Sequence, residues 1–555
     1  MNIKDFLILL KLCWNRSGAK INLLILVTSI TTILELFGFA LVIPLINLSF
    51  SSDGINSSKI SQTFDDFLQS IGLNLEFNLV LFMIVIIFFL KGLFVFLGNN
   101  LQIWITTGIR KTIQNKIITL YENVDYRFFM TKKIGDHTNL LIRECEGYQT
   151  VINNISKGFV AFTSALLFII SLSIVDTNFI FFLFFFSFIV FFVFIPIIKK
   201  TKFFSFSNVE LYSTLNAQLI ELIQNFSYLK GTFRTSYFTD TIYKITEKLV
   251  NINRKLGLFS NLIGSIKEPL GVLIIASLIF VKVSIFNSSL PEVIVLGLIL
   301  YRLVQKVLDI QNHWQRLNES VASVFCTENE IINLNNKQEI DGEGNLSNLK
   351  KKITFKNVSF SYDRKKILKD INLDIKPNHT TGIRGKSGIG KTTLIKLLMK
   401  LIVPDQGLII CGNKNIFDIK SEALRSKIGY VSQDINLFNG SLRENITFWA
   451  NDENNDQIKK SMKLAGCFDL YARLNENIGD KAMKLSGGQK QRVLIAREIY
   501  KKPDILIFDE PTSSLDSKSE EIIIKTIKTL KKTTTIIIVS HRKKLFKICD
   551  KIIDL

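Results

Sequence analysis

The chain has 555 residues, which exceeds the size of one compact domain, so at least two domains are expected. Its net charge of +21 comes without a basic stripe interleaved with aromatic residues, so we expect no nucleic-acid partner. The six cysteines lie far apart without metal-ligand spacing, which argues against a disulfide framework or a zinc site and suits a reducing compartment.

The first 18 residues predict an amphipathic helix along a membrane surface. Residues 1–16 lack the cleavage pattern of a signal peptide. The apolar residues and the cations lie side by side along this segment, as in interfacial helices. They are Phe6, Leu7, Leu9, Leu10, Leu12 and Trp14, with Lys4, Lys11 and Arg16. The alternative is that this segment is simply the start of the first spanning helix.

Residues 19–335 predict a transmembrane domain, because a helix needs about 20 mostly apolar residues to cross a bilayer. We expect six such helices, at 21–47, 78–105, 159–175, 178–198, 258–283 and 293–310. The loops after the second and fourth runs are rich in Lys and Arg, whereas 49–76 has only Lys59 and 285–292 has none. The positive-inside rule therefore places both termini in the cytoplasm.

Two further features of this domain lie outside the predicted spans. Within 49–76, residues 58–73 predict a short amphipathic helix outside the membrane, which either packs on neighbouring loops or contacts a lipid tail. The two long cytoplasmic loops predict helices that continue into the cytosol, with contacts to a partner domain near 126–135 and 226–240.

Ionisable residues inside the predicted spans are costly and need a reason. They are Glu35, Lys91, Lys267, Glu268 and Arg302. Salt bridges between helices, for example Glu35 with a lysine, and snorkelling near span ends are the structural alternatives. Lys91 and Arg302 lie well inside their runs, so they are the candidates for a polar cavity that contacts substrate.

After a linker at 336–350, residues 351–555 predict an α/β nucleotide-binding domain. The strands 355–360 and 380–383 precede a segment that matches GxxxxGK[ST], the phosphate loop of ATP-binding proteins. Its backbone amides and the following helix start cradle phosphates, Lys391 reaches the β- and γ-phosphates, and Thr392 binds Mg²⁺. The predicted ATP-contacting residues here are Gly385, Lys386, Ser387, Gly388, Ile389, Gly390, Lys391, Thr392 and Thr393.

An apolar strand at 505–508 ends in two carboxylates, Asp509 and Glu510. Asp509 is predicted to hold Mg²⁺. Glu510, one residue further, is predicted to polarise the attacking water as general base. Together with the phosphate loop, this pair indicates ATP hydrolysis.

The run Leu485-Ser486-Gly487-Gly488-Gln489 resembles the signature of ATP-binding-cassette (ABC) transporters. Physically it is a second helix start able to bind phosphate, through Ser486 and the following amides. The resemblance implies that Ser486, Gly487, Gly488 and Gln489 contact a nucleotide held by the phosphate loop of a second copy. The expected assembly is a homodimer with twofold symmetry.

Other residues match the same family. The resemblance implies that Tyr362 stacks on adenine, that Gln433 meets Mg²⁺ and the attacking water, that Asp516 crosses the dimer interface, and that His541 contacts the γ-phosphate. The segment before the signature, Gly479-Asp480-Lys481-Ala482, resembles the exporter segment Gly-Glu-Arg-Gly but has alanine in place of the second glycine. The chain is also shorter after His541 than many relatives, a departure that touches no predicted phosphate contact.

The order of segments is that of an exporter half-transporter: an all-α transmembrane domain of six helices extending into the cytosol, followed by an α/β phosphate-loop domain. Within the family, residues 35–44, the external helix, Lys91 and residues 300–303 resemble bacterial flippases for polyprenyl-pyrophosphate-linked oligosaccharides. This implies an inner-membrane protein that contacts lipid. Export of a peptide or another amphiphile is the main alternative; a soluble cassette ATPase and an ATP-gated channel are weaker ones.

Overall fold

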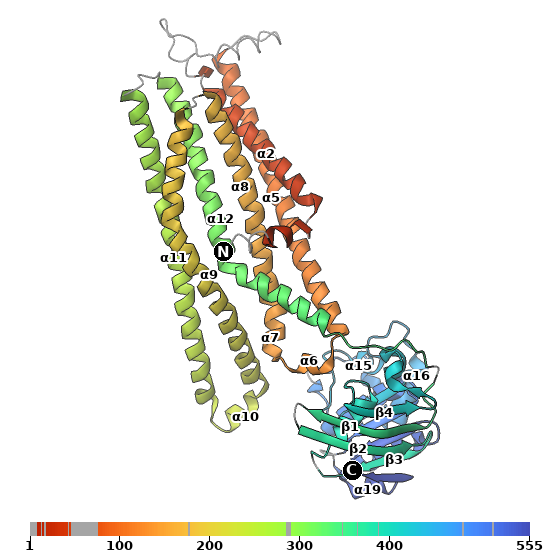
Figure 1. Cartoon of the computed structure of the whole chain (residues 1–555). Coiled ribbons are helices and arrows are strands. Elements are labelled where there is room, and N and C mark those ends of the chain that lie inside the picture. Colours follow the sequence, from red (N-terminus) through yellow and green to blue (C-terminus); the bar gives the residue numbers. More distant parts are fainter. Residues whose placement is uncertain are drawn as a thin grey trace. The chain divides into compact units, whose positions relative to one another are not determined.

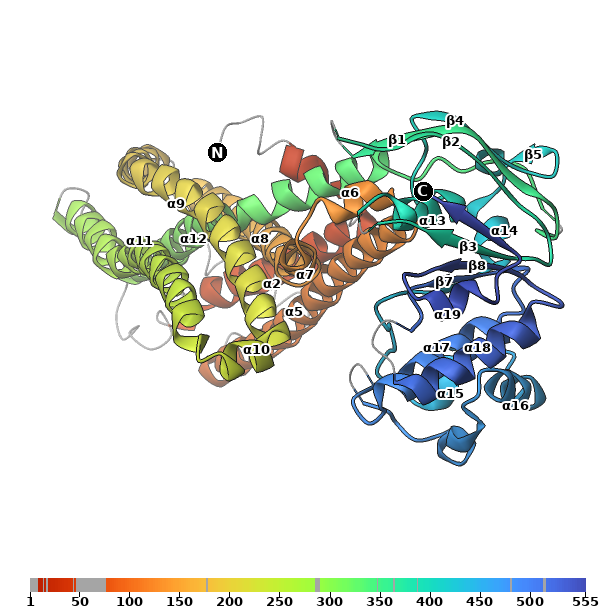
Figure 2. The same cartoon turned by 90° about the horizontal axis from the view of Figure 1, so that it is seen from below.

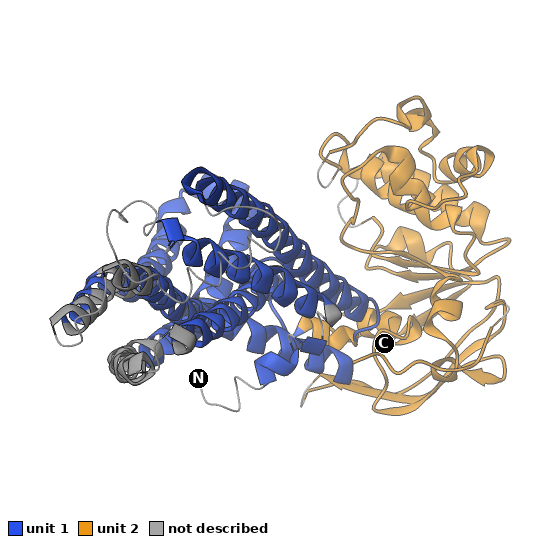
Figure 3. Ribbon diagram, turned by 90° about the horizontal axis from the view of Figure 1, so that it is seen from above, with its two compact units in different colours: residues 1–124, 131–337 blue, residues 125–130, 338–555 orange. Residues whose placement is uncertain are grey.

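The computed structural model (Figure 1) describes residues 8–12, 14–15, 18–42, 44–45, 76–175, 178–284, 290–346, 348–362, 365–386, 388–479, 482–512 and 516–555. The chain divides into two compact units (Figure 3). Unit 1 comprises Met1–Val124 and Thr131–Lys337, and unit 2 comprises Asp125–Met130 and Gln338–Leu555. The short segment Asp125–Met130 thus belongs with the second unit, although both of its neighbours along the chain belong to the first.

Unit 1 is helical throughout its described secondary structure. Its long helices are α2 (Ala19–Ala40), α5 (Phe77–Glu122), α8 (Cys145–Val175), α9 (Asn178–Gln224), α11 (Thr235–Ser284) and α12 (Leu290–Asn336). Its short elements are α7 (Ile134–Asn139), the π-helix η1 (Leu140–Glu144) and α10 (Phe226–Gly231). Helices suit a bilayer because every backbone polar group is satisfied within the segment.

Five of the six predicted runs fall within one of these long helices, whereas the first, 21–47, extends beyond the end of α2 at Ala40. Three described helical segments are long and apolar enough to cross a membrane: Lys20–Ala40, Phe77–Glu122 and Ile134–Leu172. That all six cross remains a prediction. The 46 residues of α5 correspond to roughly 70 Å at 1.5 Å per residue, more than twice the thickness of the hydrocarbon core. Long helices that extend beyond the predicted spans are therefore present.

The described core of unit 1 lies where α8 packs along α12 (Figure 1). Phe168 of α8 and Leu300 of α12 are fully buried there, and Phe39 of α2 joins the same cluster. Gly147 allows the close approach, since a Cβ atom at this position would collide with the Ser323 side chain of α12. Small residues at such crossings are typical of membrane helix pairs.

The predicted surface helix of residues 1–18 is described only in part. Residues 8–12 and 14–15 are helical, with Leu9 buried and Ile8 and Trp14 exposed. The predicted external helix at 58–73 lies outside the described residues, as do the side chains of Lys267 and Glu268.

Unit 2 contains two sheets (Figure 2). The antiparallel sheet, ordered β2-β1-β4-β5, consists of β1 (Ile353–Tyr362), β2 (Lys365–Ile375), β4 (Gln406–Cys411) and β5 (Lys414–Asn415). The parallel sheet, ordered β6-β7-β8-β3-β9, consists of β6 (Ile428–Val431), β7 (Ile505–Asp509), β8 (Thr535–Val539), β3 (Thr380–Arg384) and β9 (Lys551–Asp554). β7 and β8 are buried along their whole length, which explains their apolar runs at 505–508 and 536–539.

Helices cover the parallel sheet. They are α13 (Lys391–Leu398), α14 (Ser421–Arg425), α15 (Leu442–Thr447), α16 (Asn455–Leu464), α17 (Gly487–Tyr500), α18 (Ser517–Leu530) and α19 (Lys543–Phe546), with 3-10 turns η2 (Ile416–Asp418) and η3 (Phe468–Arg473). One core joins α13 to both sheets. A second core joins α16, α17 and α18 to β7 and β8. Figure 2 shows α17 and α18 on one side of β7 and β8, with the antiparallel sheet on the other.

The segment Asp125–Met130 contains α6 (Tyr126–Met130) and packs within unit 2. Arg127 donates a hydrogen bond of 3.1 Å to the carbonyl oxygen of Val403, and its guanidinium lies 4.3 Å from the ring centroid of Phe360. Lys396 of α13 lies over the ring of Tyr126 at 5.1 Å. The predicted contact between residues near 126 and the nucleotide-binding domain is therefore present.

Candidate active site

The predicted catalytic residues meet at one edge of the parallel sheet. The phosphate loop follows β3, Asp509 and Glu510 lie at the end of β7, and His541 follows β8. These three strands are neighbours in the order β7-β8-β3, and they run parallel. Their carboxyl ends therefore open on the same edge, where ligands bind in sheets of this kind.

The phosphate loop depends on glycine at two positions. Gly388 and Gly390 have φ angles of 81° and 112°, a region that residues with a Cβ rarely adopt. A Cβ on Gly390 would also lie 2.7 Å from Cδ2 of Leu368. Gly390 caps α13, so the free N–H groups of that helix face the loop. Ser387 lies outside the described residues.

Lys391 is the cation of this loop. Its side-chain ammonium donates to the carbonyl oxygens of Gly385 at 2.9 Å and Lys386 at 3.0 Å. The residue is only 7% exposed, so its charge is directed into the loop rather than into solvent. Thr393, also in the first turn of α13, is buried.

Two oxygen atoms suited to bind Mg²⁺ lie together at the predicted metal site. Thr392 Oγ1 lies 3.5 Å from Oδ2 of Asp509, and the Tyr430 hydroxyl donates to that same oxygen at 3.2 Å. Hydroxyl and carboxylate oxygens are the ligands that Mg²⁺ prefers, so these residues fit the ion. Burial raises the pKa of Asp509, the charge of Glu510 adds to this effect, and the hydrogen bond from Tyr430 opposes it.

Glu510 and His541 are brought together by the sheet. Oε1 of Glu510 lies 3.1 Å from Nε2 of His541. That nitrogen also lies 3.1 Å from Nζ of Lys391. Glu510 has a φ of 50°, which turns the chain sharply after β7, and its N–H donates to the Val539 carbonyl at 2.8 Å. The strained backbone therefore presents the carboxylate beside the phosphate loop.

Tyr362 and Gln433 lie further out. Tyr362 ends β1 and is 39% exposed, with its ring edge-on to Phe360 at a centroid distance of 4.9 Å. Gln433 follows β6 and is exposed. Within the described part of the chain, no hydrogen bond joins Gln433 to Asp509 or Thr392.

The signature forms the predicted helix start. Ser486 caps α17: its hydroxyl oxygen accepts from the N–H of Gln489 at 3.3 Å, and its own N–H donates to the Gln489 side chain at 2.9 Å. Such a reciprocal box orients the helix start and leaves the N–H groups of Gly487 and Gly488 to other partners. Asp516 caps the neighbouring helix α18 by accepting from the N–H of Ser519.

Gly488 and the start of α18 lie against each other. A Cβ on Gly488 would lie 2.5 Å from Oγ of Ser519 and 3.9 Å from Oδ1 of Asp516. The structure thus brings the signature beside Asp516. Among the described residues, no hydrogen bond or ion pair links the signature to the phosphate loop of the same chain. Ser514 and Leu515, and Asp480 and Lys481, lie outside the described residues.

Sequence reasoning missed Tyr430, the hydroxyl donor to Asp509. The contact spans 79 residues, so no local motif reports it. The available signal was the pairing of β6 with β7, which sets Tyr430 opposite Ile507. Ser519 was also missed, because its role is to face a glycine on another helix.

In unit 1, the two substrate candidates share one carboxylate. Lys91 Nζ of α5 lies 3.1 Å from Oε2 of Glu35 on α2, and Arg302 Nε of α12 lies 3.0 Å from Oε1. Glu35 is 5% exposed, whereas the side chains of Lys91 and Arg302 are 19% and 41% exposed. The structural alternative of an ion pair between helices is therefore correct for Glu35. The three residues form what we call the charge triad, with one net positive charge.

Comparison with known proteins identifies both units. Residues 22–303, half of the chain, match the ABC transporter transmembrane region, and residues 368–513 match the ABC transporter domain. The heterocyst differentiation ATP-binding protein HepA of Nostoc sp. is 29% identical over 361 residues, covering 64% of this chain and 59% of HepA. The leukotoxin translocation ATP-binding protein LktB of Mannheimia glucosida is 34% identical over 273 residues, covering 48% of this chain and 38% of LktB.

The chain therefore spans about three-fifths of the length of HepA and about two-fifths of the length of LktB. A solved bacterial Atm1-family ABC exporter with ATP bound has the same fold, with a TM-score of 0.77, 20% identity, and coverage of 98% of this chain and 93% of that one. The matched transmembrane region and the phosphate loop, carboxylate pair and signature assembled in unit 2 lead to one conclusion: the chain belongs to the ABC transporter family.

Proposed function

We propose that this chain hydrolyses ATP and uses the energy to export or flip an amphiphilic substrate across a bacterial inner membrane. The observation that carries this proposal is the convergence of Lys391, Asp509, Glu510 and His541 at one edge of the parallel sheet, in a chain whose other half is a membrane domain. Both termini are expected in the cytoplasm, as the distribution of positive charge predicts.

Each residue has a task in hydrolysis. The N–H groups at the start of α13 and Lys391 bind the phosphates, and Tyr362 offers a partly exposed ring to the adenine. Glu510 accepts the proton of the attacking water, with His541 holding the carboxylate and contacting the γ-phosphate. Thr392, Asp509 and Gln433 would hold Mg²⁺, which neutralises charge on the phosphates.

We propose that two copies complete the site. The signature at α17 is a phosphate-binding helix start that has no phosphate loop opposite it among the described residues of its own chain. Twofold pairing would set it against the partner's nucleotide. Residues 226–240 present strongly exposed aromatic side chains, among them Tyr228 and Phe233 at 68% and 90% exposure. Such side chains are suited to contact a nucleotide-binding domain and to transmit its closure to the membrane helices.

The cargo is proposed from the charge triad. Ionisable groups inside a membrane domain mark substrate pathways, and this cluster draws on α2, α5 and α12. Its net charge is positive, and a carboxylate already sits between its two cations. The two cations are partly exposed, so they can also bind the anionic oxygens of a substrate beside Glu35. We propose a lipid-linked oligosaccharide whose pyrophosphate binds Lys91 and Arg302. Peptide or protein export is the second candidate, favoured by the 34% identity to LktB, which is named for leukotoxin translocation.

The triad supplies a sharp test. Lys91→Ala with Arg302→Ala should abolish flipping of a fluorescent polyprenyl-pyrophosphate-linked oligosaccharide in proteoliposomes, while basal ATP hydrolysis is spared. Glu35→Gln should instead strengthen binding of the same lipid, because it frees both cations from their internal partner. If the ion pair is purely structural, Glu35→Gln should instead destabilise the protein and lower both lipid binding and ATP hydrolysis. Normal flipping by the double variant would exclude the proposal that Lys91 and Arg302 bind a lipid-linked oligosaccharide. Stimulation of ATP hydrolysis by an added peptide would then favour peptide or protein export.

A further inference from the structure

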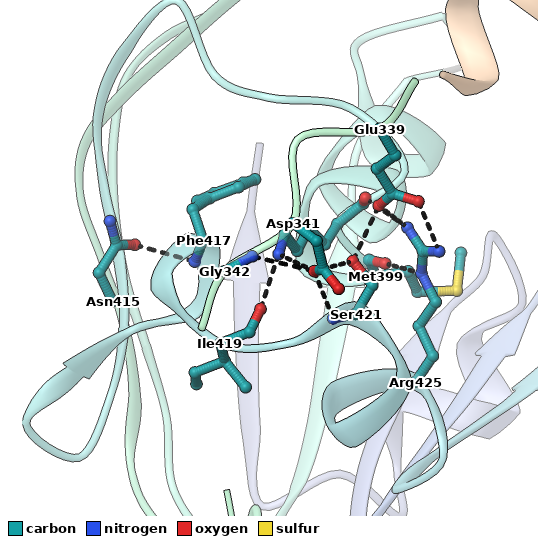
Figure 4. A network of polar contacts seen from close by, with 10 residues as sticks. Glu339, Asp341, Gly342, Met399, Asn415, Phe417, Ile419, Ser421 and Arg425 are labelled. Atoms are coloured by element: carbon teal, nitrogen blue, oxygen red, sulfur yellow. Dashed lines mark hydrogen bonds and ion pairs between the residues drawn. The ribbon is translucent and has the colours of Figure 1, made fainter. Parts of the chain in front are cut away.

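The segment that follows α12 is firmly bound to unit 2 (Figure 4). It lies within the predicted linker at 336–350, and we call residues 339–344 the strap. Its backbone joins unit 2 through Gly344, whose N–H donates to the Asp418 carbonyl at 2.9 Å and whose carbonyl accepts from the N–H of Lys420 at 2.8 Å. Gly342 passes so close to Asp418 that a Cβ atom would overlap its backbone. The strap therefore has one defined path.

Asp341 anchors the strap through one carboxylate oxygen. Oδ1 accepts from Lys400 Nζ at 2.9 Å, from the Ser421 N–H at 2.7 Å and from the Ser421 hydroxyl at 2.9 Å. The Lys400 side chain is 2% exposed, and its ammonium also donates to the Ile419 carbonyl at 2.6 Å. Partial burial opposes ionisation of Asp341, but these hydrogen bonds outweigh it and hold its pKa at about 2.

Glu339 anchors the strap through Arg425. The two side chains form a bidentate pair: Arg425 Nη1 donates to Oε2 at 3.0 Å, and Nη2 donates to Oε1. The same guanidinium donates from Nε to the Met399 carbonyl at 3.0 Å and from Nη2 to the Lys400 carbonyl at 2.7 Å. Arg425 thus links the strap to the backbone at residues 399–400 (Figure 4).

These partners sit at one end of the phosphate-loop helix. Met399 is the C-cap of α13, and Lys400 follows it. The other end of α13 is Gly390 and Lys391, where phosphate is expected. The helix has eight residues, about 12 Å at 1.5 Å per residue, so it is a short rigid rod. Arg425 also places a cation at the negative end of the helix dipole.

We propose that the strap couples the phosphate-loop helix to the last membrane helix, so that movement of α13 on nucleotide binding is transmitted along the chain to α12. Glu339 and Asp341 are positioning residues in this route, since Asp341 binds Lys400 just beyond α13 and Glu339 reaches the end of α13 through Arg425. Coupling needs a contiguous set of contacts, and the strap supplies one within eight residues of the end of α12 at Asn336. The proposal is independent of the cargo.

Hydrogen exchange of the full chain in nanodiscs tests it, with and without ATP, Mg²⁺ and vanadate. The wild type should gain protection both at the phosphate loop, residues 385–398, and in the cytosolic part of α12, residues 311–336. The double variant Glu339→Gln with Asp341→Asn should keep the change at the phosphate loop and lose at least three-quarters of the change in α12. The KM for ATP should stay within twofold.

Glu476→Gln is the matched control, because Arg473 and Glu476 form a bidentate pair of similar exposure away from α13. It should leave both changes intact. Unaltered protection of β7 and β8 in the double variant shows that the domain is folded. If α12 still gains full protection in the folded double variant, the proposal is wrong. If a global loss of protection replaces the selective one, the strap is only a structural clamp and the proposal is again wrong.

Discussion

Replacing Glu510 by glutamine isolates its proposed role as general base. Glutamine has nearly the same shape, and the backbone hydrogen bond to Val539 and the neighbouring His541 remain. The Glu510 side chain is 21% exposed, so the substitution leaves no buried charge unpaired and little change in stability is expected. What is lost is basicity. General-base catalysis contributes about 10²–10⁴-fold, which corresponds to roughly 2.7–5.4 kcal/mol of transition-state stabilisation.

The assay compares phosphate release with nucleotide binding in the purified protein. Glu510→Gln should lower the hydrolysis rate by about 10²–10⁴-fold. Affinity for ATP should stay within a factor of about three, and the ATP-bound closed dimer should accumulate. Glu521→Gln, at an exposed position on α18, is the control and should behave as wild type. Hydrolysis within a factor of about five of wild type would refute the assignment of Glu510 as general base.

Three further predictions follow from contacts in unit 2. Gly488→Ala should reduce ATP hydrolysis at least tenfold with ATP binding intact, because the new Cβ would lie 2.5 Å from Ser519 Oγ. Adding Ser519→Gly should restore part of the rate, and a double variant without any restoration would argue against this steric cause. Burial raises the pKa of the Cys467 thiol to about 12, so at pH 8 only about one Cys467 side chain in 10⁴ is a thiolate. Mass spectrometry should therefore find Cys467 unalkylated by iodoacetamide until urea is added. The pKa of Asp341 is lowered to about 2, so its contribution to stability is present above its ordinary pKa of 3.8 and is lost as the pH falls towards 2. Asp341→Asn should therefore lower the free energy of unfolding, measured by denaturant titration, by about 1 kcal/mol at pH 7 after allowance for solvent screening, and by clearly less at pH 3. An equal loss at both pH values would contradict the ionised carboxylate.

The sequence by itself determined the parts of this protein whose chemistry is local. The phosphate loop is readable because its glycines, Lys391 and Thr392 act through a continuous stretch of backbone. The apolar runs are readable because a bilayer demands one helix length. The signature is readable because Ser486 and Gln489 cap the helix that they begin. In each case residues a few positions apart carry the whole physical requirement.

Only the tertiary structure decided which distant residues meet. The pairing of β6 with β7 brings Tyr430 to Asp509, and no spacing in the sequence reports that contact. Lys91 and Arg302 could have faced a cavity independently, but the packing of α2, α5 and α12 gives them a common carboxylate in Glu35. Likewise, a segment predicted only as linker is held through Asp341 to the end of the phosphate-loop helix. Such contacts depend on how elements pack, because burial selects partners across the chain that periodicity and motif spacing do not encode.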